Sequence, residues 1–268
     1  MREIVVMGLI AILLTACSAP GEEAPPAAAA KELAPTGRLR AGLNFANALL
    51  TGKDPTTGEA RGVAADIARE LGRRLGVPVD VVAYESAGAL ADAAANGAWD
   101  IGFLGAEPQR ASVIDFTAAY AEIESTYLVP PGSPLQRVED VDRDGVRITI
   151  AAKSAYDLYL TRTLQHARLE RTDGADAAFA KLVADKMDAM AGLRPALVGY
   201  AEKLPGSRVL DGGFTTIQQA IGTPVGRGEG ATYLRAFVED IKANGFVAQA
   251  IERNGVRGLT VAPADGTQ

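Results

Sequence analysis

The chain has 268 residues, of which 48% are hydrophobic and 22% charged, and its formal net charge is −6. This length and apolar content indicate a globular protein of one or two domains with a sizeable core. The acidic balance, together with the absence of any Lys/Arg run, argues against nucleic acid or an anionic membrane surface as the main partner.

The N-terminus has the features of an export signal. Arg2 precedes the apolar segment IVVMGLIAILLTA, which is shorter than the roughly 20 residues of a membrane-spanning helix. We therefore expect residues 1–16 to be a cleaved signal peptide. The following LTAC resembles the bacterial lipobox, and Cys17 is the only cysteine of the chain. Lipidation of Cys17 is the main hypothesis and a buried thiol the alternative, which predicts a protein held by lipid in the periplasm or at the cell surface.

Residues 17–35 are rich in Ala, Pro and Glu and predict a flexible tether. After Gly37, short apolar strands alternate with segments of helical periodicity. The first expected elements are strand 38–44, helix 63–76 ending at Gly76, strand 78–84, a helix from about 86 that ends near Gly97, and a buried strand before Gly105. This order predicts a largely parallel α/β sheet.

A strand in STYLVPPGSPL and its Pro/Gly break close this unit, and a second α/β unit of similar style follows. Its expected strands are 147–152, 169–172 and 187–192, and its expected helices are 155–167, 175–185 and 194–204. A later strand, 214–225, leads to one long amphipathic helix, 230–255.

Six segments along residues 36–262 resemble the bacterial extracellular solute-binding proteins of family 3, the receptors of polar amino-acid ABC importers. They occur in the family's order and spacing: GRLRAGLN, GVAADIARELGRRLGVPVDVVAY, NGAWDIGFLGAEPQRASVIDFTAAY, ITIAAKSAYDLYL, KMDAMAGLRPAL and NGFVAQAIERNG. The resemblance implies a type II periplasmic-binding-protein fold, in which two α/β lobes with mainly parallel sheets are joined by two hinge strands. Lobe 1 would comprise 36–128 and 222–262, lobe 2 would comprise 129–221, and 263–268 would be a tail.

The resemblance also implies partners. A small-molecule ligand would lie between the lobes, and an ABC permease in the inner membrane would receive it. We expect a monomer with no cofactor and no metal, since His166 is the only histidine and Cys17 the only cysteine.

Arg110, in EPQRASVIDFT, matches the family's cleft arginine, whose planar guanidinium would donate two parallel hydrogen bonds to a ligand carboxylate. An exposed arginine, or one paired with Glu107 or Asp115, is the alternative. Ser154 and Ala155 match the helix N-terminal turn that would receive the same carboxylate, although Ser154 is also simply a good N-cap.

Two departures from the family concern the ligand. The loop before Arg110 is about two residues shorter than in amino-acid binders and offers Glu107 in place of hydroxyl groups. Leu193 stands where the family has the Asp that pairs with an α-ammonium group. We therefore expect a carboxylate ligand that is not a standard α-amino acid, unless Glu107 or Glu124 supplies the missing charge.

Other cleft candidates follow the first strand and the Ser154 turn. Phe45 is either a stacking platform or a core residue, and Asn44 and Asn47 would lie beside it. Tyr156 would cover the ligand from lobe 2, with helix packing as the alternative.

Catalytic signals are weak, because His166 lies in a polar stretch and no phosphate-binding glycine motif is present. We expect a binding protein and not an enzyme. The alternative is a dehydratase resembling cyclohexadienyl dehydratase on the same scaffold, which would use Glu107 and Lys153.

Overall fold

The computed structural model describes residues 25–266, so the predicted signal peptide, Cys17 and the first part of the predicted tether lie outside the described residues. Its α-helices are α1 (Ala27–Leu33), α2 (Val63–Leu75), α3 (Ala87–Asp92), α4 (Ala155–Thr163), α5 (Ala175–Ala184), α6 (Arg194–Lys203), α7 (Gly228–Ala243) and α8 (Phe246–Arg253). Its strands are β1 (Leu39–Asn44), β2 (Gly52–Lys53), β3 (Ala60–Arg61), β4 (Val79–Tyr84), β5 (Ile101–Gly105), β6 (Ile114–Val129), β7 (Arg147–Ala151), β8 (Arg168–Thr172), β9 (Ala189–Leu193), β10 (Arg208–Val209), β11 (Thr215–Pro224) and β12 (Thr260–Val261).

One continuous sheet runs through the molecule in the order β4-β1-β5-β11-β6-β9-β7-β8, and β10 and β12 also pair with β6. The ladders of β1 with β4 and β5 are parallel, as are those of β7 with β8 and β9. The ladders that involve β6 or β11 are antiparallel. Two mainly parallel α/β units are therefore joined through two antiparallel strands.

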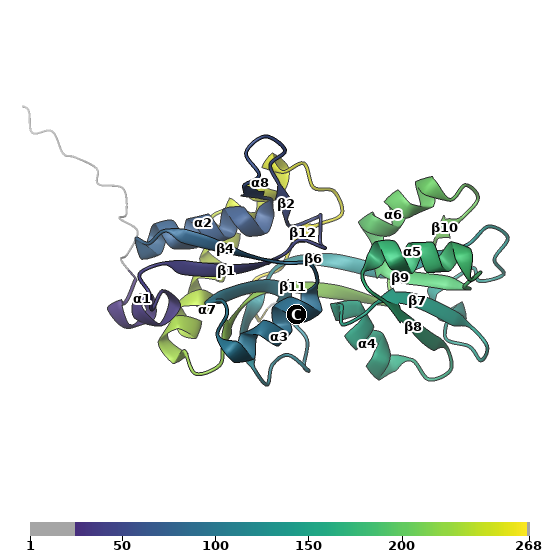
Figure 1. Ribbon diagram of the computed structural model, residues 1–268, viewed down its shortest axis with the longest axis horizontal. Coiled ribbons are helices and arrows are strands. Elements are labelled where there is room, and N and C mark those ends of the chain that lie inside the picture. The colour runs from purple at the N-terminus through teal and green to yellow at the C-terminus, as the bar shows by residue number, and fades with distance from the viewer. Residues whose placement is uncertain (1–24, 267–268) are drawn as a thin grey trace, which may run out of the picture.

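Figure 1 shows these two units as lobes lying side by side along the long axis. Lobe 1 contains β1, β4 and β5 with α1, α2, α3, α7 and α8, and lobe 2 contains β7, β8 and β9 with α4, α5 and α6. Strand β6 pairs with β9 from Ser125 to Leu128, and β11 begins opposite Ser125 at Thr215. The chain thus passes between lobes inside β6 and β11, and the boundaries expected after residues 128 and 221 fall within these strands.

The sheet of lobe 1 is covered on both faces. Alternate residues of β1, such as Leu39, Ala41 and Leu43, join a core formed with α2, α7 and α8. The opposite face packs against α3, where Leu90 and Trp99 belong to a smaller core. Successive side chains of a strand point to opposite faces, so these buried strands carry apolar residues on both.

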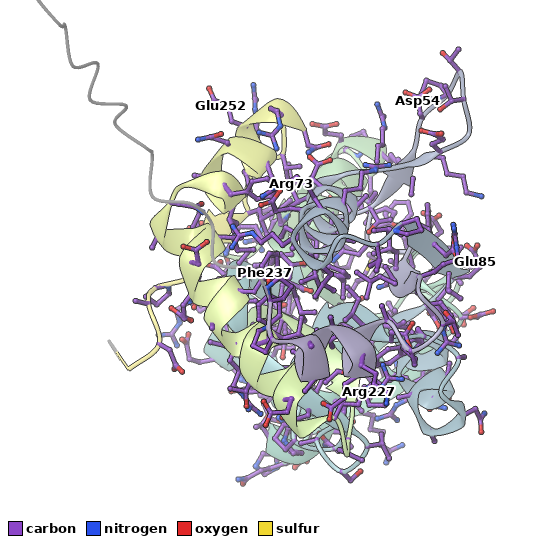
Figure 2. All side chains as sticks on the ribbon, turned by 90° about the vertical axis from the view of Figure 1, so that its left-hand side faces the viewer. Asp54, Arg73, Glu85, Arg227, Phe237 and Glu252 are labelled. Atoms are coloured by element: carbon purple, nitrogen blue, oxygen red, sulfur yellow. The ribbon has the colours of Figure 1, made fainter. Side chains whose placement is uncertain are left out.

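In lobe 2, Ile148 and Ile150 of β7 face a core built with α4, while Met190 of β9 faces a core built with α5 and α6. Viewed toward the end of lobe 1, α7 lies beside α1 and α2 (Figure 2). Phe237 of α7 is buried there, and the guanidinium of Arg74 in α2 lies 5.0 Å from its ring centre. Within residues 25–266, no helix is both long enough and apolar enough to cross a membrane.

Glycines set both ends of α2. Gly62 has φ 111°, and a Cβ there would lie 2.4 Å from the carbonyl oxygen of Leu50. Gly76 ends the helix in the left-handed region with φ 68°, as its sequence position predicts. Gly62 and Gly76 therefore define where α2 begins and ends, and its first turn packs closely against the loop that follows β1.

The expected single helix over 230–255 is wrong, because the structure has two helices, α7 and α8. Gly245, with φ 82°, lies between them in the left-handed conformation. A residue in this conformation ends a helix, and glycine adopts it without a steric penalty from Cβ. The helix 155–167 is also shorter than expected and ends at Thr163.

The tether expected over residues 17–35 is wrong in its second half, because residues 27–33 form α1. Leu33 is fully buried and packs against Gly230 of α7, where an added Cβ would lie 3.0 Å from the Leu33 side chain. The Glu32 carboxylate accepts a hydrogen bond of 2.8 Å from the backbone N–H of Gly230. The folded body thus begins near Ala27.

Replacement of Leu33 by Ala tests whether α1 is part of lobe 1. We expect a loss of about 2–4 kcal/mol in the free energy of unfolding, because the change leaves a cavity between α1 and α7. Denaturant unfolding measures it, with the exposed Lys31→Ala in the same helix as the control. A Leu33→Ala protein as stable as the control would contradict the packing of α1.

Candidate ligand-binding cleft

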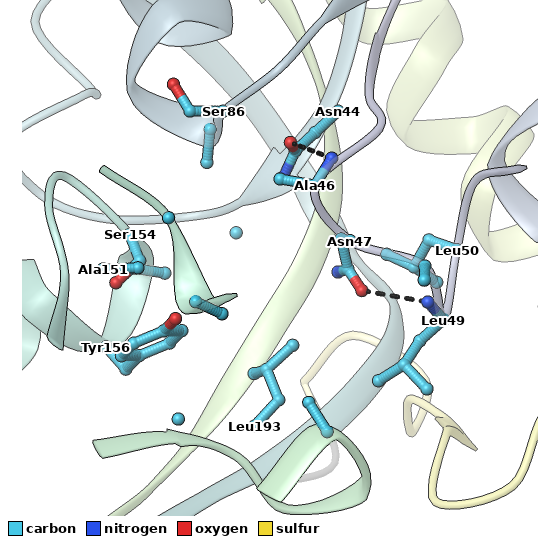
Figure 3. Close-up of a pocket in the computed structure, with 18 of the residues that line it drawn as sticks. Asn44, Ala46, Asn47, Leu49, Leu50, Ser86, Ala151, Ser154, Tyr156 and Leu193 are labelled. Atoms are coloured by element: carbon cyan, nitrogen blue, oxygen red, sulfur yellow. Dashed lines mark hydrogen bonds between the residues drawn. The ribbon is translucent and has the colours of Figure 1, made fainter. Parts of the chain in front are cut away.

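A cavity of about 830 Å³ lies between the lobes. Lobe 1 contributes the loop after β1 and the end of β5, and lobe 2 contributes the N-terminal turns of α4 and α5 and the junction of β9 with α6. Figure 3 shows Asn44, Asn47 and Leu50 on one side of this space and Ser154 and Tyr156 on the other. The cavity is within the usual size of small-molecule sites.

Arg110 lines this cavity and is only 4% exposed. Its Nη1 donates a hydrogen bond to the Gly105 carbonyl in lobe 1 (2.6 Å), and its Nη2 donates one to the Lys153 carbonyl in lobe 2 (2.9 Å). The guanidinium is thus held between the lobes, and two of its five N–H groups suffice for these bonds.

The charge of Arg110 has no partner of opposite sign within the described residues, where it makes no ion pair with a carboxylate. Burial lowers the pKa of Arg110 to about 10, although the negative charges of Glu107 and Asp92 oppose this shift. The group is still a cation at neutral pH. Removal of a cation from water costs several kcal/mol when no anion compensates it, so the site favours an anionic ligand.

Ser154 is the N-cap of α4, and its hydroxyl accepts a hydrogen bond of 3.1 Å from the Asp157 backbone N–H. The N-cap alternative for Ser154 is therefore observed, and the residue also lines the cavity together with Ala155. Lys153 precedes the cap with φ 54°, an uncommon conformation for lysine that directs its carbonyl to Arg110. The local fold of this turn thus serves the inter-lobe contact.

The other aromatic and amide candidates also line the cavity. Phe45 is half-buried against the lobe 1 core, with Lys53 Nζ 5.4 Å from its ring centre, and Tyr156 is buried in the lobe 2 core. Burial raises the pKa of Tyr156 to about 12, so its hydroxyl stays neutral. Asn44 and Asn47 accept hydrogen bonds from the N–H groups of Ala46 and Leu49 within their own loop (Figure 3).

Leu193 lines the cavity at the end of β9 and packs against the cores of both lobes. The two carboxylates that could replace the missing Asp are engaged elsewhere. Glu107 is buried, does not line the cavity, and forms an ion pair of 2.6 Å with Arg162. Glu124 pairs with Arg194 at 2.5 Å.

The structure does not bring Glu107 and Lys153 together. Lys153 Nζ forms an ion pair of 2.6 Å with Asp92 of α3, across the lobe boundary. Glu107 is held by Arg162 of α4, whose Nη1 also donates to the side chain of Gln109. Both pairs connect the lobes beside Arg110.

Two residues at the cavity escaped the sequence analysis. Gly105 is necessary for the contact of the lobes, because a Cβ there would lie 2.8 Å from the Ala155 Cβ and 2.9 Å from Ile217 Cγ2. Gln219 of β11 is a buried polar residue that lines the cavity. The available signal for Gln219 was a pair of glutamines in the middle of the strand expected over 214–225.

A family model agrees with this arrangement of two lobes around a cleft. The model of the bacterial extracellular solute-binding proteins, family 3, matches residues 50–255. The chain belongs to this family. The assignment confirms the predicted family, and five of the six segments lie within the matched residues, since GRLRAGLN precedes them. The two-lobed fold of this family 3 protein is shared with solved structures of binding proteins.

A solute receptor for L-cysteine from Neisseria gonorrhoeae superposes with a TM-score of 0.73 at 20% identity, covering 88% of this chain and 99% of that receptor. A mutant of ArgBP from T. maritima gives 0.71 at 20% identity, with coverage of 85% and 100%. An ancestral amino acid-binding protein, described as a precursor of cyclohexadienyl dehydratase, gives 0.69 at 23% identity, with coverage of 84% and 98%. At these identities the similarity shows the fold. A comparison with curated protein sequences found no match.

Replacement of Gly105 by Ala tests the contact of the lobes in this family 3 protein. The added methyl group overlaps Ala155 of lobe 2, so we expect the lobes to separate and the contact of α4 with β5 to weaken by about 1–3 kcal/mol. Small-angle X-ray scattering would show a larger radius of gyration. Gly199→Ala in α6 is the control, because a Cβ there meets nothing within 4 Å. Equal scattering curves for the two variants would contradict this role of Gly105.

Proposed function

We propose that this protein is the substrate-binding lipoprotein of an ABC importer and that it captures a small organic carboxylate between its two lobes. The observation that carries the proposal is the buried guanidinium of Arg110, which faces the inter-lobe cavity without a counter-ion among residues 25–266. A carboxylate would supply that counter-ion through parallel charge-assisted hydrogen bonds. Ser154 and Ala155, at the start of α4, would add polar contacts on the lobe 2 side.

The contacts of the acidic residues favour a ligand without an α-ammonium group. Glu107 and Glu124 are paired with Arg162 and Arg194, and Leu193 presents an apolar side chain. The carboxylates that do line the cavity are all exposed: Glu85, Asp173, Asp176 and Glu202. An ammonium group beside Arg110 would therefore be desolvated without a buried negative partner, which is costly.

The same contacts support a binding protein over an enzyme. A dehydratase on this scaffold would need a carboxylate and a lysine in the cleft, and Glu107 and Lys153 were the expected pair. Glu107 is instead buried against Arg162 outside the cavity lining, and Lys153 reaches Asp92. Hinge motion about β6 and β11 would open the cleft, and the closed form would dock on a permease of the inner membrane.

Replacement of Arg110 by Met tests the proposal. A thermal-shift panel of carboxylates, amino acids and aromatic acids first identifies the acid that most stabilises the wild type. Titration calorimetry with that acid should then show at least about a 100-fold loss of affinity in Arg110→Met, because two charge-assisted hydrogen bonds are lost. The affinity of Arg110→Lys should lie between those of the wild type and Arg110→Met, since lysine keeps the positive charge but loses the planar pair of donors.

Arg168→Met is the control, because Arg168 is exposed at the first residue of β8 and neither it nor its ladder partner Arg147 lines the cavity. Its affinity should equal that of the wild type. Unchanged affinity in Arg110→Met would overturn the carboxylate clamp. A standard α-amino acid as the strongest binder would overturn the interpretation of Leu193.

Replacement of Cys17 by Ser tests the lipid anchor, which rests on the lipobox-like LTAC sequence and on the extracellular character of the family. In a Gram-negative host, the wild-type protein should incorporate an alkyne-labelled fatty acid and sediment with membranes. The Cys17→Ser protein should lose the label and keep residues 1–16, because cleavage at a lipobox requires the acylated cysteine. Incorporation of the label by Cys17→Ser would contradict acylation of this residue.

A further inference from the structure

Gln219 has a polar side chain for which the protein provides no partner. The residue is only 4% exposed and lines the inter-lobe cavity, and its side-chain amide makes no hydrogen bond to any residue of the range 25–266. Its amide atoms are not among the fully buried unpaired side-chain atoms of this range, so they open onto the cavity. A ligand without a matching polar group would cover the amide and leave it unpaired, which costs about 1–3 kcal/mol. A partner for the amide is therefore expected on the ligand.

The strand register places Gln219 next to Arg110. Gln219 of β11 pairs with Gly105 of β5, and the Gly105 carbonyl is the acceptor for Arg110 Nη1. A Cβ added to Gly105 would lie 3.8 Å from Arg110 Nη1 and 2.9 Å from Ile217 Cγ2. Ile217 and Gln219 are two residues apart in the strand and so share one face. Gly105, Ile217 and Gln219 therefore lie on the sheet face that also carries the Arg110 guanidinium.

The ladder of β11 with β6 is irregular at this point, with register shifts between Gln219 and Ala220 and between Ala220 and Gly222. Such bulges occur beside functional sites, where they change the direction of a side chain. The irregularity therefore affects the segment of β11 that presents Gln219 to the cavity.

The buried polar groups around the cavity, other than Arg110, are neutral. Gln219, Thr51 and Tyr156 carry no charge at neutral pH, and the lining carboxylates are exposed. A ligand carboxylate on Arg110 would neutralise the single buried charge. A group next to that carboxylate should consequently be polar but neutral, since a second charge would remain uncompensated.

We propose that Gln219 recognises a neutral hydrogen-bonding group on the carbon next to the ligand's carboxylate, so that the protein binds 2-hydroxy or 2-oxo acids. The amide offers both a donor and an acceptor, so it satisfies a hydroxyl or a carbonyl group. The inference rests on the proposed function, because it assumes that Arg110 holds the carboxylate. The rest of the cavity, with Phe45, Leu49 and Leu193, accommodates an apolar body.

The test uses acids that share one body and differ at the second carbon. 3-Phenyllactate, phenylpyruvate, 3-phenylpropanoate and phenylalanine form one set, and 2-hydroxy-4-methylpentanoate, 4-methyl-2-oxopentanoate, 4-methylpentanoate and leucine form a second. Titration calorimetry of the wild type should show that the 2-hydroxy or 2-oxo acid binds at least about 10-fold more tightly than the unsubstituted acid. The unsubstituted acid binds more weakly because it leaves the Gln219 amide unpaired. The amino acid should be the weakest member of each set.

Replacement of Gln219 by Leu should remove this discrimination, because the substituted and unsubstituted acids then meet the same apolar surface. Gln218→Leu is the matched control, since Gln218 precedes it in the same strand and does not line this cavity. Gln218→Leu should keep the 10-fold ratio of affinities between the substituted and unsubstituted acids. Thermal melting of both variants shows that they are folded, and Gln219→Asn provides a second, polar replacement that should keep part of the ratio.

The outcomes separate this inference from the proposed function. An unchanged ratio in Gln219→Leu, or a wild type that binds the unsubstituted acid as tightly as the 2-hydroxy acid, would overturn the role of Gln219 while Arg110 still binds carboxylates. If phenylalanine or leucine binds best, both the neutral-group inference and the interpretation of Leu193 are wrong. If no acid of either set binds the wild type but another carboxylate of the thermal-shift panel does, this inference is overturned and the proposed function stands. If no carboxylate of the panel or of either set binds, both are overturned.

Discussion

The antiparallel pairing of β6 with β11 is the constraint on which the arrangement of the molecule depends. Both strands belong to the sheets of both lobes, so their backbone hydrogen bonds hold β5 on one side and β9 on the other at a fixed register. The cavity lies beside this junction, and β11 contributes Ile217 and Gln219 to its lining. Any relative motion of the lobes must bend these two strands, and the register shifts near Ala220 place the irregular part of the ladder next to the cavity.

Charges at the junction are distributed unevenly. Glu107 and Asp92 each form an ion pair with a cation of the opposite lobe. These two ion pairs contribute unequally to the contact between the lobes, because Glu107 is buried whereas Lys153 and Asp92 are both more than half exposed. An exposed pair contributes at most about 1 kcal/mol, so the Glu107 pair and the backbone contacts of Arg110 dominate the contact. Arg110 is left as a buried cation that makes no ion pair with a carboxylate of residues 25–266. Under the proposed function, this unpaired charge would favour anionic ligands before their shape is considered.

Much of the fold could be predicted from the sequence, and the failures have physical causes. Periodicity located α2 and β5 because their burial is regular. Strand β6 was not recognised as one 16-residue element, since its environment changes from lobe 1 to lobe 2 along its length. Helix α1 has a composition typical of a tether, and its anchor, Gly230, is distant in sequence. The eight cavity-lining candidates came from a resemblance, while Gln219 was missed because the absence of a hydrogen-bond partner is visible only in three dimensions.

Docking of α1 on α7 sets a limit on how far the body can stand from a membrane. Under the proposed acylation of Cys17, only the chain from Cys17 to Ala27 separates the lipid from the folded lobe. Ten residues span at most about 35 Å even when fully extended. Lobe 1 would thus stay within roughly one domain diameter of the bilayer, with its α1 and α7 end closest to the anchor. Such a short connection to the lipid would raise the local concentration of the receptor at membrane-embedded partners and restrict the orientations in which it can meet them.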